Sequence, residues 1–511
     1  MKTNYSVSFL YVYVFLTGAA VMSLEIAASR FLAPYYGTSM IVWANIIGLI
    51  LLSLSVGYWI GGKWADKRPD GYLLMKISLF SGVFVSILPL WSKFLFPMLS
   101  AGIMNTSIWI IIGSFFAILL VFAPPVFLLA MVSPFAIRLI AKETENLGKV
   151  AGNLTAFSTL GSLFGTFGTA FGTIPFLGAR ETIFVCSSFL IIISTAGLWK
   201  SPAKKLGIFI IVPVLLYFMT NTKETTMAGE KILWEQDSLY QHIRVTQDDS
   251  KDISLVYNEG GGVQSLRRAD DSLYHDDYYN NYLLVPFLVD SPKEVLILGS
   301  AGGTIPRSMA TYVKPLFPNL NISGVEIDSD VIELSSRFFD LQPKDAKIIN
   351  QDARVFINST NQLYDAVMVD CYSQQIYIPF HLSTVEFFNT LREKLTKNGV
   401  IAMNVNATTP DSRLLTSLTK TLQQVFPYTY SVKVRGQYNY MLLGAIHPLD
   451  TEQIKEIDVT NPLAEIKKEC PENLEALLPH QIQKGDILTD NHAPTEWLTD
   501  SMIYREANTR D

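Results

Sequence analysis

The stretch that decides the fold of the C-terminal half is EVLILGSAGGT, residues 294–304. Four apolar residues follow Glu294, which is typical of a strand buried on both faces of a sheet. Gly299, Gly302 and Gly303 come directly after this run, and glycine lets a backbone turn sharply and approach a ligand closely. The stretch therefore predicts a strand of a doubly wound α/β sheet, with a ligand above its glycine turn.

Two later apolar strands end in acidic residues. Ile322–Ile327 carries Glu326 near its end and is followed by Asp328, and Tyr364–Val369 runs into Asp370. Helical stretches separate these strands, and strand–helix alternation indicates a parallel sheet. Because ligands of such sheets bind beyond the carboxyl ends of the strands, we expect these acids to face one crevice.

Acids at these positions suit an adenosine-containing ligand. Glu326 is placed to accept hydrogen bonds from ribose hydroxyls, and Asp352, which precedes Ala353, can accept one from an adenine amino group. The alternative is a structural turn with solvated acids. The GxGxxG spacing of dinucleotide folds and a Walker lysine are both missing from the sequence.

Charge divides the chain into two halves. Of 511 residues, 49% are apolar and 17% charged, against about 25% charged in soluble proteins. Residues 1–222 hold 14 Lys/Arg and 6 Asp/Glu, which leaves 26 and 40 for the rest. Net charges of +8 and −14 result. Disorder, a disulfide-rich secreted module and nucleic-acid binding are all disfavoured.

The N-terminal half predicts a polytopic α-helical membrane domain, since spans need about 20 apolar residues. A shorter run at Leu206–Thr220 contains Pro213 and either crosses fully, which would put the C-terminal half outside, or is re-entrant or interfacial, so the count stays at six to eight. Pro124 and Pro125 should kink the fourth span, which could continue to Ile140. The expected spans are Val7–Ala28, Ile41–Gly61, Leu73–Phe96, Ile108–Ala130, Val150–Ile174 and Thr182–Leu198.

Lys and Arg gather in the loops after the second, fourth and sixth spans. The positive-inside rule then predicts a multi-pass protein of the inner (plasma) membrane, in contact with the lipid bilayer, with its C-terminal half in the cytoplasm. Within this half, Glu25 and Arg30 flank the end of the first span and are candidates for a functional site or an interfacial ion pair. Gly161, Gly165, Gly168 and Gly172 predict a face for close helix packing.

The remaining chain predicts three further parts after the transmembrane domain at 1–222. A small β unit at 223–290 contains the strand-like runs Tyr240–Gln247, Ile253–Tyr257 and Val263–Arg267. A Rossmann-like domain at 291–450 is followed by a C-terminal segment at 451–511. Runs at Tyr428–Val434 and Tyr438–Ile446 could close the sheet as antiparallel strands. Three scattered cysteines and six dispersed histidines argue against a metal site.

From about Asp237 to Ala407 the residues resemble the aminopropyltransferases, the spermidine and spermine synthases. Leu24, Glu25 and Arg30, with Gly61–Asp66, are similar to the membrane-integrated branch of that family, as is the C-terminal Leu488–Glu496. The resembling motifs are Asp237–Gln241 (S-x-Y-Q), Tyr274-His275-Asp276 (Y-H-E), Val295–Thr304 (glycine loop), Val325–Asp328 (ribose acid), Asp352-Ala353 (adenine contact), Val369-Asp370 (catalytic aspartate) and Pro379 (closing loop).

The resemblance implies a S-adenosylmethionine-dependent transferase type of fold. In the family, decarboxylated S-adenosylmethionine donates an aminopropyl group to a polyamine acceptor and leaves methylthioadenosine. Asp370 would be the base, and Tyr274, His275 and Asp276 would lie on the acceptor side. No metal takes part, the other partners are small molecules, and homodimers are common. The donor or nucleoside would be bound by Gln241, Gly299, Gly302, Glu326, Asp328, Asp352, Ala353 and Pro379.

Two departures from the family pattern keep other functions open. Gly302 stands where the family has the aspartate of its glycine loop, and Ser373 stands where a second acid follows the base. Each missing carboxylate weakens the capture of a cationic diamine. A lyase that converts intact S-adenosylmethionine to methylthioadenosine and a lactone is one alternative. A transporter with a nucleoside- or polyamine-sensing domain is another, supported mainly by Glu25.

Overall fold

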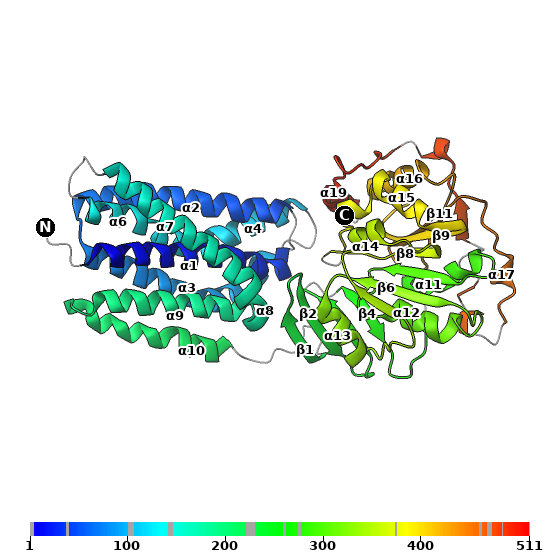
Figure 1. Ribbon diagram of the computed structural model, residues 1–511, viewed down its shortest axis with the longest axis horizontal. Coiled ribbons are helices and arrows are strands. Elements are labelled where there is room, and N and C mark those ends of the chain that lie inside the picture. The colour runs from blue at the N-terminus through cyan, green and yellow to red at the C-terminus, as the bar shows by residue number, and fades with distance from the viewer. Residues whose placement is uncertain are drawn as a thin grey trace. The chain divides into compact units, whose positions relative to one another are not determined.

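The computed structural model describes residues 5–36, 40–100, 107–141, 147–220, 230–258, 262–273, 277–373, 376–458, 462–464, 466–467, 473–482 and 484–509. The chain divides into two compact units. The helical unit comprises Met1–Glu224 together with Gln236–His242, and the sheet unit comprises Thr225–Glu235 together with Ile243–Asp511. Figure 1 shows both units.

The helical unit is built from long apolar helices. Within the described residues, seven helices are long and apolar enough to cross a membrane. Its elements are α1 (Val7–Tyr36), α2 (Met40–Lys67), α3 (Gly71–Ser100), α4 (Ser107–Val121), α5 (Ala123–Ala130), α6 (Val132–Ile140), α7 (Leu147–Gly168), a π-helical turn (Thr169–Thr173), α8 (Ile174–Leu177), α9 (Ala179–Leu198), a 3-10 helix (Pro202–Ile210) and α10 (Ile211–Thr220).

Prolines shape two of these spans. The predicted kink at Pro124 and Pro125 is confirmed, because α4 ends before Phe122 and both prolines lie in the first turn of α5. The run expected to be short is longer than predicted, since helix extends over Pro202–Thr220, 19 residues. Pro213 lies in the first turn of α10, which continues directly from the 3-10 helix Pro202–Ile210.

Only part of the predicted glycine face makes a close helix contact. A Cβ atom on Gly161 would lie 1.9 Å from the carbonyl oxygen of Phe15, and one on Gly165 would lie 2.2 Å from that of Ala19. Helix α7 therefore packs directly against the backbone of α1 at these two glycines. Gly168 and Gly172 have no such neighbour within 4 Å.

The sheet unit begins with a four-stranded antiparallel sheet in the order β1-β2-β3-β4. Its strands are β1 (Lys231–Asp237), β2 (His242–Gln247), β3 (Ile253–Tyr257) and β4 (Val263–Arg267). Three of them match the expected small β unit, and β1 was not predicted. Figure 1 shows this sheet in green next to the larger sheet of the unit.

The larger sheet has eight strands in the order β12-β10-β11-β9-β8-β5-β6-β7. Strands β7, β6, β5, β8 and β9 are parallel to one another, while β11, β10 and β12 are added antiparallel, as the sequence suggested for two of them. They are β5 (Glu294–Leu298), β6 (Asn321–Glu326), β7 (Lys347–Asn350), β8 (Tyr364–Val369), β9 (Leu395–Asn406), β10 (Tyr428–Lys433), β11 (Asn439–Ala445) and β12 (Leu474–Ala476).

Helices cover both faces of this sheet. In β5, Val295 and Ile297 belong to one hydrophobic cluster, and Leu296 and Leu298 belong to another, which explains why the whole run is apolar. The helices are α11 (Tyr278–Leu284), α12 (Thr304–Ser308), α13 (Ser329–Phe338), α14 (Ala353–Ser359), α15 (Val385–Glu393), α16 (Arg413–Gln423), α17 (Glu452–Lys455) and α19 (Thr495–Thr509).

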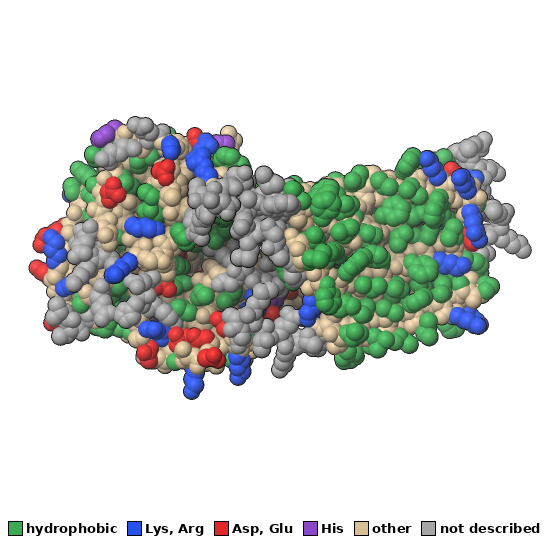
Figure 2. All heavy atoms as spheres, turned by 180° about the vertical axis from the view of Figure 1, so that it is seen from behind, with side chains coloured by type: hydrophobic (Ala, Val, Ile, Leu, Met, Phe, Trp, Pro, Cys, Tyr) green, Lys and Arg blue, Asp and Glu red, His purple; other side chains and the backbone are tan. Residues whose placement is uncertain are grey.

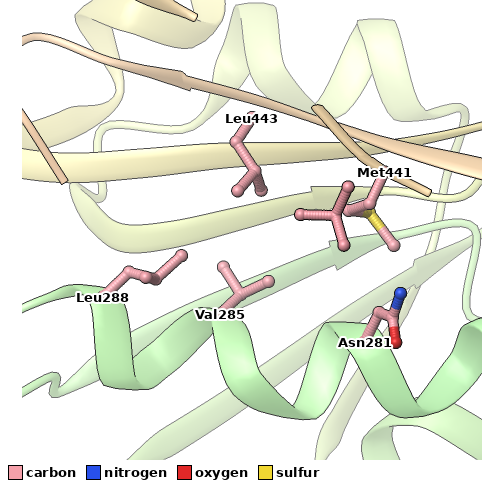
Figure 3. Close-up of a pocket in the computed structure, with 6 residues that line it drawn as sticks. Asn281, Val285, Leu288, Met441 and Leu443 are labelled. Carbon is pink, nitrogen blue, oxygen red and sulfur yellow. The ribbon is translucent and has the colours of Figure 1, made fainter. Parts of the chain in front are cut away.

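A small void lies in the core between α11 and strands β10 and β11 (Figure 3). Its volume is about 10 Å³, and apolar side chains such as Val285, Leu288 and Met441 line it. Asn281 is buried here, and neither polar atom of its amide has a hydrogen-bond partner among the described residues. The space is about that of one water molecule, which would satisfy part of the amide.

Candidate active site

The glycine turn brings the ends of β5 and β8 into contact. Gly299 has φ +84°, and a Cβ atom there would lie 2.4 Å from the carbonyl oxygen of Asp370. Gly299 donates its N–H to the carbonyl oxygen of Val325 at 2.9 Å, and Asp370 donates its N–H to that of Leu298 at 2.9 Å. A larger residue at 299 would push the ends of these strands apart, so the position requires glycine.

Glu326, at the end of β6, is buried beside this turn. Its carboxylate accepts the N–H of Ala301 at 2.9 Å and the N–H of Asp328 at 3.1 Å. Burial raises the pKa of Glu326 to about 7, against these hydrogen bonds. Asp328 itself caps helix α13, since its side chain accepts the N–H of Asp330 at 3.1 Å. The acid predicted for the ribose therefore lies at the glycine turn.

Asp352 and Ala353 lie after β7, at the start of α14. The Asp352 carboxylate caps this helix by accepting the N–H of Val355 at 2.9 Å, and Ala353 is buried. Nε2 of His381 lies 3.6 Å from the Asp352 carboxylate. His381 follows Pro379 in the loop after β8, so this loop reaches the helix start that was predicted to contact adenine.

Asp370, at the end of β8, is held by two side chains from other elements. Its Oδ1 accepts a hydrogen bond from Nδ2 of Asn404 in β9 at 3.1 Å. Its Oδ2 accepts one from the hydroxyl of Tyr278 in α11 at 3.3 Å. Burial raises the pKa of Asp370 to about 7, although both hydrogen bonds favour the charged form. A carboxyl that titrates near neutral pH suits a general base.

A cavity of about 360 Å³ opens beside Asp370. Tyr278 and Asn404, which hold the Asp370 carboxylate, are both part of its wall. Carboxamides and tyrosines dominate the described lining, and Asp277 is its carboxylate. The lining consists of Gly262, Val263, Gln264, Leu266, Asp277, Tyr278, Tyr279, Tyr372, Ile376, Asn404, Asn406, Gln437 and Asn439.

The acids that precede α11 differ in environment. Asp271 is half exposed and pairs with Arg267 and Arg307, as expected of a solvated loop. Asp277 instead lines the cavity, and burial raises its pKa to about 6, against a hydrogen bond from Nε2 of Gln437 at 3.4 Å. One acid of this stretch thus belongs to the site.

The remaining predicted site residues fall in three different places. Tyr274, His275 and Asp276 are outside the described residues. Gln241 belongs to the helical unit, where its carbonyl oxygen accepts the N–H of Ser238 at 2.9 Å. Gly302 lies under β4, since a Cβ atom there would lie 2.8 Å from that of Ser265. Its N–H donates to the Ser265 hydroxyl at 2.8 Å.

In the helical unit, Glu25 and Arg30 both lie in α1. Nη2 of Arg30 donates to the carbonyl oxygen of Leu239 at 2.6 Å. In the same unit, the carboxylate of Asp237 accepts the N–H of Ala179, at the start of α9, at 2.9 Å. The segment with the S-x-Y-Q pattern is therefore held by the ends of α1 and α9.

The C-terminal segment reaches α14. Asp490 forms two hydrogen bonds of 2.6 Å with the guanidinium of Arg354, which follows Ala353. The same guanidinium donates to the carbonyl oxygen of His381 at 2.7 Å. The resembling C-terminal motif thus joins the helix start at Asp352 to the loop after β8.

Sequence reasoning missed Tyr278, Asn404 and Asn439. They come from one helix and two strands outside the recognised motifs, and an isolated Tyr or Asn carries no signal of its own. In the described part of the chain, no group of three or more His, Cys, Asp or Glu side chains is placed to hold a metal ion.

Comparison with known families shows what this part of the chain is similar to. Residues 279–445, which contain both Asp370 and Asn404, match the family described as spermine/spermidine synthase domain. This chain contains a spermine/spermidine synthase domain. The resemblance found in the sequence is confirmed, and the chain has homologues among the polyamine aminopropyltransferases, a transferase family.

Some relatives match more of this chain than residues 279–445, and others match less. A protein of Bifidobacterium longum named probable polyamine aminopropyl transferase is 37% identical over 175 residues, which are 34% of this chain and 37% of that protein. The polyamine aminopropyltransferase of Leptospira interrogans is 22% identical over 468 residues, 85% of this chain and 87% of that protein. A probable spermidine synthase structure from Corynebacterium glutamicum has a TM-score of 0.40 at 18% identity, and the match covers 50% of this chain and 96% of that chain.

Proposed function

We propose that this chain is a membrane-integrated spermidine synthase-like enzyme. It would transfer an aminopropyl group from decarboxylated S-adenosylmethionine to a polyamine or related amine and release methylthioadenosine. The observation that carries the proposal is the meeting of Glu326, the glycine turn and Asp370 at adjacent strand ends, beside a cavity of about 360 Å³. The names of the relatives support the same reaction.

The proposed roles follow from the chemistry of each group. Glu326 would accept hydrogen bonds from the ribose hydroxyls, and Asp352 one from the adenine amino group. An ammonium ion in the cavity would lose a proton to Asp370, whose pKa of about 7 permits this at neutral pH. The freed nitrogen lone pair then forms a bond to the carbon next to the sulfonium, the carbon–sulfur bond breaks, and its electrons stay on the sulfur of methylthioadenosine.

One observation favours a second candidate, the lyase. The cavity wall holds Asp277 as its described carboxylate, whereas carboxamides form much of the remainder. Intact S-adenosylmethionine could use its own carboxylate as the nucleophile and form a lactone. This route needs a shaped, polar cavity and no carboxylates for a second ammonium group.

The helical unit supports residence in a membrane. Hydrophobic side chains cover the face of this unit in Figure 2, and Lys and Arg gather at one of its ends. Exposed aromatic residues such as Phe164, Phe167 and Phe171 lie on or next to α7. We therefore propose a multi-pass protein of the plasma membrane whose Lys- and Arg-rich loops face the cytoplasm. If Pro202–Thr220, which is long enough to span, crosses fully, the seven spans place the sheet unit on the opposite side of the membrane. If this helix lies at the interface instead, the sheet unit is in the cytoplasm.

The experiment that tests the reaction uses the full chain purified in detergent. Decarboxylated or intact S-adenosylmethionine is supplied with and without putrescine or spermidine, and methylthioadenosine is followed by mass spectrometry. Product that requires both the decarboxylated donor and an amine supports aminopropyl transfer. Product from intact S-adenosylmethionine alone assigns the lyase instead. Absence of product under every condition rejects both.

A further inference from the structure

The two oxygens of Asp370 have different kinds of partner. Oδ1 faces a carboxamide nitrogen, Nδ2 of Asn404, at 3.1 Å. Oδ2 faces the hydroxyl of Tyr278 at 3.3 Å. An amide NH₂ can only donate, whereas a phenol hydroxyl donates or accepts as it rotates. The two oxygens are therefore not equivalent as places for a proton.

The orientation of Asn404 is fixed by a third residue. Nδ2 of Asn439 donates to Oδ1 of Asn404 at 2.9 Å and to Oδ1 of Asn406 at 2.7 Å. Strands β11 and β9 set this geometry, because Asn439 pairs directly with Asn406 in their register. Asn404 and Asn439 are 2% and 8% exposed, so water cannot easily replace these hydrogen bonds.

Turning the Asn404 amide over would break both ends of this chain of hydrogen bonds. Its oxygen would then face the carboxylate of Asp370, and its NH₂ would face the NH₂ of Asn439. Buried polar groups left without partners in this way are strongly disfavoured. Asn404 is consequently held as a donor to Oδ1 of Asp370.

We propose that Asn439 and Asn404 are positioning residues that reserve Oδ2 of Asp370, the oxygen beside the Tyr278 hydroxyl, as the atom that takes the proton from the amine. This rests on the proposed function for the identity of the amine. A proton on Oδ1 would point at a group that has no lone pair to accept it. A proton on Oδ2 can be donated to the Tyr278 oxygen once that hydroxyl rotates.

The step balances without any further reactant. The N–H bond of the ammonium group breaks and leaves its electron pair on nitrogen, and an O–H bond forms at Oδ2. Tyr278 and Asn404 both line the cavity of about 360 Å³, so an amine bound there lies near both partners of the carboxylate, of which only the Tyr278 hydroxyl can accept a proton. Asp370 thereby loses its negative charge and becomes a neutral acid that is hydrogen-bonded to Tyr278.

Other titratable groups lie around Asp370 and influence its protonation. Asp277 adds a negative charge that raises the pKa of Asp370. The phenols of Tyr278 and Tyr282 face it from α11, and Cys371 and Tyr372 follow it in the chain, with pKa values raised well above their usual range by burial. These four groups stay neutral at working pH, so Asp277 is the neighbour that can change its charge.

The test measures the pH–rate profiles of Asn404→Leu and Asn439→Leu. In both variants the leucine side chain is similar in size to the asparagine that it replaces. Loss of a hydrogen bond to a charged group raises the midpoint of the acidic limb of the pH–rate profile by about one to two pH units. Asn404→Leu removes the donor, whereas Asn439→Leu only releases its orientation, so we expect a smaller shift in the same direction for Asn439→Leu and no further shift in the double variant than in Asn404→Leu. Asn439→Ser, which keeps a donor, should restore the wild-type midpoint. Asn321→Leu at the opposite end of the sheet is the matched control.

A second readout does not depend on turnover. The thermal unfolding midpoint of the wild type should fall as pH rises from about 4 to about 7 and level off above, because burial disfavours the ionised forms of Asp370 and Glu326. Asp370→Asn should reduce this fall to the part that Glu326 contributes, and Asn439→Leu should move the Asp370 inflection upward as in the rate profile. If no amine yields product, the proposed function fails while this inflection still decides the positioning. An unmoved inflection in Asn439→Leu, or additive shifts in the double variant, would overturn the proposal.

Discussion

The two units differ in the kind of polar side chain that they bury. In the helical unit, Thr17 donates to the carbonyl oxygen of Tyr13, and Ser53 donates to that of Leu49, each one turn back in the same helix. In the sheet unit, Asp370 is bonded by Tyr278 and by Asn404, from α11 and β9. The buried polar side chains described in the helical unit are hydroxyls, and some of them bond between helices, as Ser187 does to the carbonyl oxygen of Gly82. The sheet unit instead holds carboxyls whose pKa is raised to about 7 by burial, Glu326 and Asp370.

The largest test of this difference is Asp370→Asn. We expect methylthioadenosine formation to fall by about 10²- to 10⁴-fold, since a positioned general base contributes on that order. Asp365→Asn, at the other end of β8, is the control. Asp365 accepts the backbone N–H groups of Lys293 and Glu294, so its loss should act on stability and leave the turnover number near that of the wild type. Equal turnover in both variants would remove Asp370 from the chemistry.

Glu326→Gln is expected to weaken donor binding more than turnover. A charge-assisted hydrogen bond contributes about 1.5–3 kcal/mol, so the KM for the donor should rise by roughly 10- to 150-fold. Measurement of KM and kcat with saturating amine separates the two effects. Glu333→Gln, an exposed acid on the neighbouring helix α13, provides the comparison. A KM unchanged in Glu326→Gln would place the ribose elsewhere.

In the helical unit the sensitive positions should be those of close packing. Gly161→Ala places a methyl group against the carbonyl oxygen of Phe15 and should lower the free energy of unfolding in detergent by about 1–3 kcal/mol. Gly152→Ala in the same helix has no atom within 4 Å of the new Cβ, so it should be neutral or stabilising. Thermal unfolding of both variants measures this. Similar losses in the two would contradict the packing of α7 on α1.

The smallest expected effect concerns the ion pair of Asp490 with Arg354. Because Asp490 is about half exposed, Asp490→Asn should lower the free energy of unfolding by only about 1 kcal/mol. Arg354 lowers the pKa of Asp490, so the contribution is present at neutral pH and is lost as pH falls below about 4. Unfolding of both proteins at pH 7 and in acid measures it.

Asp411→Asn breaks a more exposed pair with Lys484 and should change stability less than Asp490→Asn does. If the two variants lose the same free energy of unfolding, the contact of the C-terminal segment with α14 contributes no more to stability than an exposed surface ion pair. If Asp490→Asn also raises the donor KM, the segment helps to hold the helix start that carries Asp352.

The sequence pattern was enough to place the candidate residues that lie at the ends of parallel strands. Gly299, Glu326 and Asp370 follow apolar runs, and parallel strands bring their carboxyl ends to one edge of a sheet whatever the details of packing. The acids near α11 show where this reasoning stops. Asp271 and Asp277 look alike in the sequence, yet one pairs with arginines in solvent and the other lines the cavity.

By itself the sequence determined that one half of the chain is apolar helices and the other a sheet with a glycine turn and strand-end acids. Composition and periodicity are local properties, and they decide which segments are buried. Only the tertiary structure decided that Tyr278 and Asn404 hold Asp370, that Asn439 holds Asn404, and that α7 packs on α1 at two glycines out of four. Such contacts depend on strand register and helix orientation, which are set by packing across the whole unit.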